Sequence, residues 1–178
     1  MNRPNCPYQV TKSETYQIGR IKIIKDTILI GGTEHPYTYI QQDPGVCVLA
    51  TYHGNVVLIE QYRHALDQWM TEFPCGGIDQ GETAEDAARR ELREESGYVA
   101  GEMTHLGRYY TNQGVSCAVC DVFFTRCVGR VEPHREETEF IRVRMVPLAE
   151  MENMIETNRF QFLVGMTAWN QAKIHDLL

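Results

Sequence analysis

The sequence predicts an α+β fold, in which a β-sheet domain carries a small number of helices. Three observations support this class. Runs of β-branched and apolar residues alternate with glycine, proline and asparagine turn signals along most of the chain. Residues 83–97 carry helix start and stop signals around a strongly acidic segment. Residues 148–156 and 162–174 have apolar side chains at helical spacing, so two helices are expected near the C-terminus.

The composition excludes several functional classes. The chain has 178 residues, of which 43% are hydrophobic, enough to bury the core of one domain with an appendage or of one larger domain. A net charge of −7 argues against a general nucleic-acid binder, which would normally carry a basic surface. No apolar run is long enough to cross a membrane, and the N-terminus lacks the apolar core of a signal peptide. We therefore expect a cytoplasmic protein with no membrane partner.

The N-terminal segment predicts a small β-region. Residues 16–30 are rich in isoleucine, lysine and threonine and predict one or two strands. Gly31-Gly32 predicts a turn, and residues 37–40 resume an extended pattern. Asp43-Pro44-Gly45 then interrupts the chain. We predict a β-region over residues 1–44 and a main domain over residues 45–178.

The main domain is predicted to open with a hairpin. Residues 46–51 and 56–61 are strand-like and flank His53-Gly54-Asn55, a strong turn signal. After the acidic helix, the pattern predicts strands near residues 104–110, 117–126 and 141–147. The two C-terminal helices follow.

The acidic helix is a candidate metal site. Thr83 suits the N-cap, and Gly97 suits the left-handed position that ends a helix. On a regular helix, Glu91, Glu94 and Glu95 fall within an arc of roughly 100°. Carboxylates this close repel one another, whereas Mg²⁺ or Mn²⁺ would bind them. Metal ions held by carboxylates in turn point to chemistry on phosphates.

The same helix has an alternative interpretation. Its ion pairs at a spacing of four residues, such as Glu85 with Arg89, are typical of a solvated face, and residues 90–96 alone favour that interpretation. The wider spacing reverses the preference. It runs Gly76, five residues, Glu82, seven residues, Arg90-Glu91-Leu92, one residue, Glu94-Glu95, one residue, Gly97 and the apolar Tyr98.

This spacing matches the Nudix box at every defining position, and the chain resembles the Nudix hydrolases. The resemblance implies the Nudix fold, a mixed β-sheet sandwiched between α-helices. It also implies a loop–helix–loop at the box, whose glutamates hold Mg²⁺ or Mn²⁺ against a substrate diphosphate. The implied metal ligands are Glu82, Glu91, Glu94, Glu95 and the backbone carbonyl of Cys75.

Two other roles at the box stay open. Arg90 either orients the glutamates through ion pairs or only stabilises the helix. The resemblance places a general base at Glu137 or Glu139, in an acidic loop before the last strand, although such a loop is also typical of plain surface. Glu91 and Glu94 are the alternative bases.

The segment before the box is similar to one branch of this family, the ADP-ribose and nucleoside-diphosphate-sugar pyrophosphatases. The similar residues are Gln61-Tyr62-Arg63, Trp69 and Glu72-Phe73-Pro74-Cys75-Gly76. The resemblance implies attack by water on a diphosphate, with release of a nucleoside monophosphate and a sugar phosphate. It also implies a homodimer, in which the N-terminal β-region is exchanged between the two copies or packs across the interface, and contacts the nucleotide. The implied substrate contacts are Arg63, Trp69, Glu72, Gly76 and Gly77.

One departure from this branch bears on the substrate. Residues 111–116 lack the proline that many ADP-ribose pyrophosphatases have after the box, and Cys117-Ala118 stands where an acidic residue is common. We therefore expect other nucleoside diphosphate sugars as substrates besides ADP-ribose. The alternatives are another diphosphate, such as a dinucleotide, a nucleoside triphosphate or a capped RNA end, or a Nudix module that senses a nucleotide without cleaving it.

Overall fold

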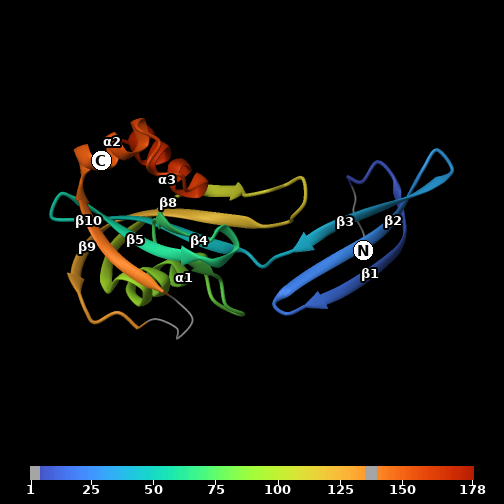
Figure 1. The fold of residues 1–178 in the computed structure, drawn as a ribbon, viewed down its shortest axis with the longest axis horizontal. Helices are drawn as coiled ribbons and strands as arrows, with labels where there is room; N and C mark the ends of the chain where they lie inside the picture. The colour runs from blue at the N-terminus through green and yellow to red at the C-terminus, as the bar shows by residue number, and fades with distance from the viewer. Residues whose placement is uncertain (1–4, 135–139) are drawn as a thin grey trace. The chain divides into compact units, whose positions relative to one another are not determined.

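The computed structural model describes residues 5–134 and 140–178 as two compact units (Figure 1). The N-terminal unit contains the chain up to Asp43 together with Tyr110–Ala118. The larger unit contains Pro44–Tyr109 and Val119–Leu178. The smaller unit is therefore built from two separate stretches of chain.

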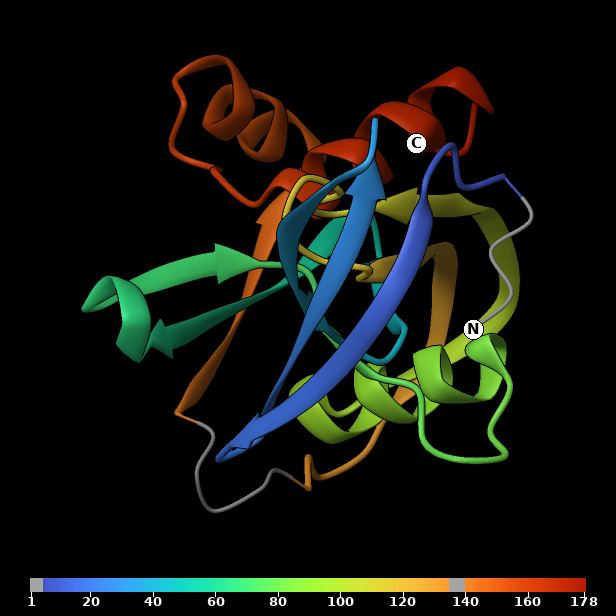
Figure 2. The same cartoon turned by 90° about the vertical axis from the view of Figure 1, so that its right-hand side faces the viewer.

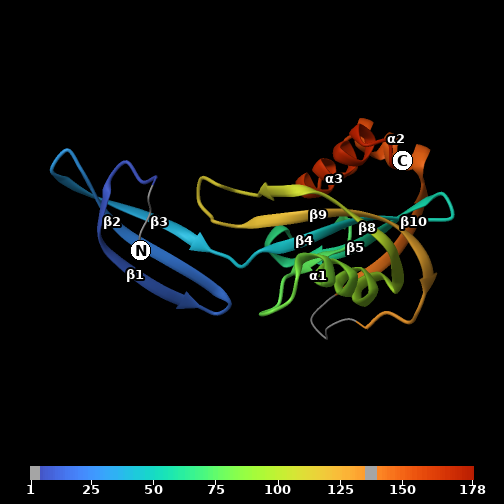
Figure 3. The same ribbon diagram turned by 180° about the vertical axis from the view of Figure 1, so that it is seen from behind.

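The N-terminal unit is a three-stranded antiparallel sheet, visible in blue in Figure 3. Its strands are β1 (Gln9–Ile18), β2 (Ile21–Ile30) and β3 (Thr33–Gln41), with β2 in the centre. Gly19 and the pair Gly31 and Gly32 have positive φ angles, which glycine adopts without strain and which the tight turns require. The sheet begins earlier than the sequence predicts because β1 pairs with β2 from Gln9 onward.

The segment 110–118 joins this sheet through backbone hydrogen bonds. The Ile40 N–H donates to the Val115 carbonyl at 2.9 Å, and the Cys117 N–H donates to the Ile40 carbonyl at 3.2 Å. The Ser116 hydroxyl also bonds to the Gln42 side chain at 2.9 Å. These contacts explain why a loop between two strands of the larger unit belongs to the smaller one.

The larger unit is built on a seven-stranded mixed sheet. Its main path runs in the order β10-β5-β4-β9-β8, and the short strands β6 and β7 pair with β5 and β4. The pair β4–β9 is parallel, and the other pairs with a defined register are antiparallel. The strands are β4 (Gly45–Tyr52), β5 (Asn55–Arg63), β6 (Gln68–Glu72), β7 (Cys75–Gly77), β8 (Tyr98–Tyr110), β9 (Val119–Arg130) and β10 (Ile141–Pro147).

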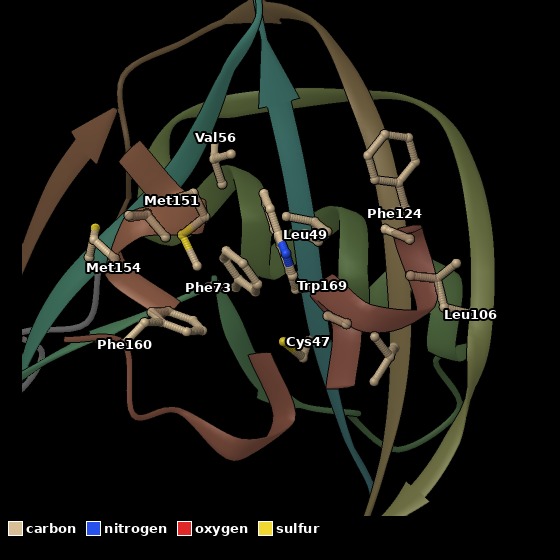
Figure 4. Packing of buried hydrophobic residues seen from close by; sticks show 14 of the residues in the cluster. Cys47, Leu49, Val56, Phe73, Leu106, Phe124, Met151, Met154, Phe160 and Trp169 are labelled. Atoms are coloured by element: carbon tan, nitrogen blue, oxygen red, sulfur yellow. The ribbon is translucent and has the colours of Figure 1, made fainter. Parts of the chain in front are cut away.

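Helices cover both faces of this sheet, as Figure 1 shows. One face packs against α2 (Leu148–Glu156) and α3 (Leu163–Ile174) through a core that includes Phe73, Met151 and Trp169 (Figure 4). The other face packs against α1 (Ala84–Glu91). The predicted α+β fold, a mixed sheet between helices, is confirmed.

The predicted first hairpin is also present. His53 and Gly54 have φ angles of 48° and 76°, the combination of a two-residue type I′ turn. After it, in a stretch for which the sequence predicts no element, β5 and β6 form a second hairpin closed by the 3₁₀ helix η1 (His64–Leu66), seen in green in Figure 2. Within the described residues, no helix has the length and apolar character needed to cross a membrane.

Candidate active site

Helix α1 begins as the sequence predicts. Thr83 has extended backbone angles, and its hydroxyl accepts a hydrogen bond from the Asp86 N–H at 3.1 Å. This bond satisfies one of the amides that the first turn of a helix leaves without a partner. Ala87 and Ala88 are fully buried against the sheet, so their small side chains bring the helix close to β4.

The end of the helix differs from the prediction of a regular α-helix. Residues Leu92–Ser96 form a π-helical turn, η2, in which the backbone hydrogen bonds span five residues instead of four. Gly97 then ends the helix in the left-handed conformation, with φ 77°. The predicted arc of glutamates assumed a constant rotation per residue, whereas the wider turn changes the direction of the side chains beyond Glu91.

The structure brings Glu91 and Glu95 to the short strand β7. The carboxylate of Glu91 occupies the space that a side chain at residue 76 would fill, so only glycine fits there without a shift of Glu91. Glu95 is 2% exposed, and its Oε2 accepts a hydrogen bond from the Cys75 N–H at 2.8 Å. The box glutamates and the Cys75–Gly77 strand, far apart in the sequence, therefore form one site.

Arg90 lies among the carboxylates. Its guanidinium contacts Glu82 at 2.9 Å, Glu91 at 2.7 Å and Glu94 at 3.3 Å. The same group donates to the Gly77 carbonyl at 2.8 Å, which ties the helix to β7. Hydrogen bonding to Arg90 lowers the pKa of Glu82, and hydrogen bonding to Glu82 raises the pKa of Arg90. Arg90 therefore makes more contacts than a single helix-stabilising ion pair.

The donor set fits a hard divalent cation. Glu82, Glu91, Glu94 and Glu95 offer only oxygen ligands, which Mg²⁺ and Mn²⁺ prefer. Among the residues that the structure describes, no three His, Cys, Asp or Glu side chains converge as a ready metal site. The guanidinium of Arg90 lies among three of the four carboxylates, those of Glu82, Glu91 and Glu94.

Two predicted substrate contacts, Arg63 and Glu72, bind each other. The guanidinium of Arg63 forms two hydrogen bonds with the carboxylate of Glu72, which is 3% exposed. This pairing raises the pKa of Arg63. The pair also contacts the Cys75 thiol, whose pKa is raised by burial. A buried carboxylate thus fixes the position of Arg63 beside the strand that carries the candidate carbonyl ligand.

Trp69 lies on β6 with 43% of its surface exposed. The guanidinium of Arg142 lies 4.0 Å from the centre of its indole ring, a cation–π contact. Sequence reasoning missed Arg142, because nothing in the local pattern shows that β6 and β10 both flank β5. The two predicted bases, Glu137 and Glu139, lie outside the described residues.

Comparison with known proteins identifies the family. The NUDIX domain model matches residues 41–164. The ADP-ribose pyrophosphatase of Bacillus subtilis (strain 168) is 31% identical over 137 residues, which cover 75% of this chain and 74% of that protein. The chain belongs to the Nudix family.

Two further similarities extend over most of the chain. The methanol dehydrogenase activator of Bacillus methanolicus is 29% identical over 153 residues, which cover 83% of each protein. A crystal structure described as an ADP compounds hydrolase superposes with a TM-score of 0.85 at 19% identity, over 99% of this chain and 100% of that one. This Nudix chain therefore shares its whole fold, including the N-terminal sheet, with a solved structure.

Proposed function

We propose that this Nudix protein hydrolyses the diphosphate bond of nucleoside diphosphate sugars, including ADP-ribose. The observation that carries the proposal is the meeting of Glu91 and Glu95 with the Cys75–Gly77 strand, framed by Arg90. Water would attack one phosphorus, and the bridging P–O bond would break to give a nucleoside monophosphate and a sugar phosphate. The similarity to the Bacillus subtilis ADP-ribose pyrophosphatase supports this choice of substrate.

Mg²⁺ or Mn²⁺ is the proposed cofactor, held by Glu91, Glu94, Glu95, Glu82 and the Cys75 carbonyl. When bound, such an ion neutralises charge on the phosphoryl oxygens and increases the acidity of water. Arg90 keeps the carboxylates near one another before binding. Glu137 or Glu139 is proposed as the base that accepts the proton of the attacking water, and Glu91 or Glu94 is the alternative.

Three groups of residues are separate candidates for contact with the rest of the substrate. Arg63, held by Glu72, is suited to a phosphate or the terminal sugar, and the exposed indole of Trp69 is suited to a planar ring. In the N-terminal unit, Tyr37 and Tyr39 line a pocket of about 240 Å³ together with Gln113, Ser116 and Cys117. Two aromatic rings beside polar groups suit a nucleobase.

We also propose a homodimer in the cytoplasm. One face of the N-terminal sheet exposes Tyr16, Ile18 and Ile21 at 46%, 63% and 47%. Grouped apolar side chains of this kind are typical of interaction surfaces. A second copy of the chain is the proposed partner for this face.

The decisive experiment is a hydrolysis assay with Mg²⁺ or Mn²⁺ on ADP-ribose, ADP-glucose, GDP-mannose, UDP-glucose and ATP, following monophosphate release. The wild-type protein is expected to cleave at least ADP-ribose. Glu95→Gln and Glu94→Gln are expected to lower the rate by about 100-fold or more. Loss of a residue that only orients a metal ligand already lowers activity by about 10- to 100-fold, and loss of the ligand itself should cost at least as much. Glu85→Gln is the matched control, since Glu85 lies on the same helix and pairs with Arg89.

Each outcome is informative. Activity on ATP alone would replace the proposed substrate with a nucleoside triphosphate. The absence of turnover with every diphosphate would remove the enzyme proposal. Wild-type rates in both glutamine variants would show that the site lies elsewhere.

A further inference from the structure

The π-helical turn at the end of the box helix carries part of the candidate metal site. Glu94 and Glu95 belong to this turn, whereas Glu91 belongs to the regular helix before it. A turn with one additional residue is less stable than a regular α-helical turn and is frequent at functional sites. Something must therefore hold it in this form.

The backbone carbonyls of the turn show what holds it. The carbonyl of Arg93 accepts the Gly97 N–H at 2.9 Å, and that of Glu94 accepts the His134 N–H at 3.1 Å. The carbonyl of Leu92 is different, because the Ser96 hydroxyl donates to it at 2.5 Å. A serine hydroxyl that bonds the carbonyl four residues earlier often bends a helix.

Ser96 is suited to this contact by its burial and by its second hydrogen bond. It is 0% exposed, so water cannot replace its hydroxyl. The same oxygen accepts the Tyr98 N–H at 3.2 Å, which fixes the chain on the far side of Gly97. The hydroxyl thus bridges the start of the wide turn and the first residue of β8.

We propose that Ser96 is a positioning residue for the metal-binding carboxylates. Its hydroxyl stabilises the wide turn, and the wide turn directs Glu95 to the Cys75 N–H and Glu94 toward Arg90. The inference rests on the proposed function, since it concerns the metal site of that reaction. Without the hydroxyl, the turn loses its hydrogen bonds to the Leu92 carbonyl and to the Tyr98 N–H, and Glu94 and Glu95 are no longer held at β7.

The test measures Mn²⁺ affinity directly, by electron paramagnetic resonance of free Mn²⁺ during titration of the purified protein without substrate. Ser96→Ala is expected to weaken Mn²⁺ binding by about 10-fold, the lower end of the range for residues that orient metal ligands. Thr167→Ala is the matched control. The Thr167 hydroxyl makes the same kind of bond, to the Leu163 carbonyl four residues earlier at 3.1 Å, but in α3.

A second variant keeps the test valid if Ser96→Ala does not fold. Ser96→Cys is close in volume and retains only a weak S–H donor, so an Mn²⁺ affinity between those of wild type and Ser96→Ala is expected. A purely structural role would lower the melting temperature while leaving Mn²⁺ affinity at the wild-type value, and that result in the folded variants overturns the inference. If the wild-type protein itself binds no Mn²⁺, the proposed function fails instead, so the two failures are distinguishable.

Discussion

Gly76 and Glu91 depend on each other at the scale of single residues. Because residue 76 has no side chain, the Glu91 carboxylate lies directly against the backbone of β7. We predict that Gly76→Ala displaces this carboxylate and lowers kcat/KM for ADP-ribose by about 100-fold, the cost of misplacing a reacting group by about 1 Å. The measurement is steady-state kinetics with saturating Mg²⁺.

Gly129→Ala is the control for this prediction. A Cβ at residue 129 on β9 meets no atom within 4 Å, so the same chemical change is made in open space. We expect wild-type kinetics for Gly129→Ala. Equal activity of the two variants would mean that the position of Glu91 does not matter for the reaction.

The sequence spacing indicated that Gly76 and the glutamates belong together, but it could not show their contacts. The ion pair joins Arg63 and Glu72 although they are not opposite each other in the β5–β6 pairing, where Arg63 is opposite Gln68 and Glu72 is opposite Ile59. The spacing of these residues along the chain does not reveal that pairing. For the same reason, Arg142 could not be linked to Trp69 before the strand order was known.

At the scale of elements, two glycines with nearly the same φ angle distinguish the cost of left-handed backbone strain from the cost of a steric clash. Gly97 and Gly54 have φ angles of 77° and 76°. A Cβ at residue 97 lies 2.5 Å from the Val131 carbonyl oxygen, whereas a Cβ at residue 54 meets nothing within 4 Å. Gly54→Ala is therefore predicted to cost only the left-handed strain, about 1–2 kcal/mol of unfolding free energy.

Gly97→Ala is predicted to cost more than Gly54→Ala, because the steric clash adds to the same strain. Urea denaturation of the two variants measures the difference. If both variants lose the same free energy, the backbone at Gly97 relaxes away from Val131 at no cost, and the end of the box helix is softer than the structure indicates.

Elements with strong local signals were predictable, and elements defined by distant partners were not. Strand β10 and helix α2 have the predicted boundaries. The strand ends at a proline, and there the spacing of the apolar residues changes from every second residue to that of a helix. Strand β7 was missed, since three residues with two glycines carry no strand signal and pair only because β4 lies beside them. The π-turn was missed because its stabilising contact is a buried hydroxyl.

At the scale of the whole molecule, Asp121 links folding stability to pH. Its buried carboxylate contacts Arg108 at 2.7 Å and His105 at 2.9 Å across β8 and β9. Burial opposes ionisation, but the hydrogen bonds and charges of Arg108 and His105 outweigh it and lower the pKa of Asp121. The ionised side chain therefore stabilises the fold above the unfolded pKa of about 3.9, and this contribution is lost as pH falls through the lower folded pKa.

Asp121→Asn is accordingly predicted to lower the unfolding free energy by about 2 kcal/mol at pH 7, the value of hydrogen bonds to a charged group. The difference from wild type should shrink as the pH is lowered from 5 to 2. Urea denaturation across this range tests it, with the exposed Glu85→Gln as control. A difference that is constant with pH would contradict the assignment of the effect to ionisation.

The proposed dimer is the second prediction at this scale. Ile18→Lys places a charge in the exposed apolar face of the N-terminal sheet, where burial of an unpaired ammonium group is costly. We expect the wild-type protein to be dimeric and Ile18→Lys to be monomeric by light scattering coupled to size-exclusion chromatography. A dimeric Ile18→Lys variant would place the interface on another surface.

The hydrogen bonds between Ile40 and segment 110–118 have a consequence for how the chain can be divided. The N-terminal sheet cannot be separated by a single cut after Asp43, because segment 110–118 of the same unit would stay attached to β8 and β9. The severed loop would expose the Val115 carbonyl and the Cys117 N–H that Ile40 now satisfies. The chain passes between the two units at three points: after Asp43, before Tyr110 and after Ala118. Insertions, fusions and domain exchanges in this protein must keep all three connections.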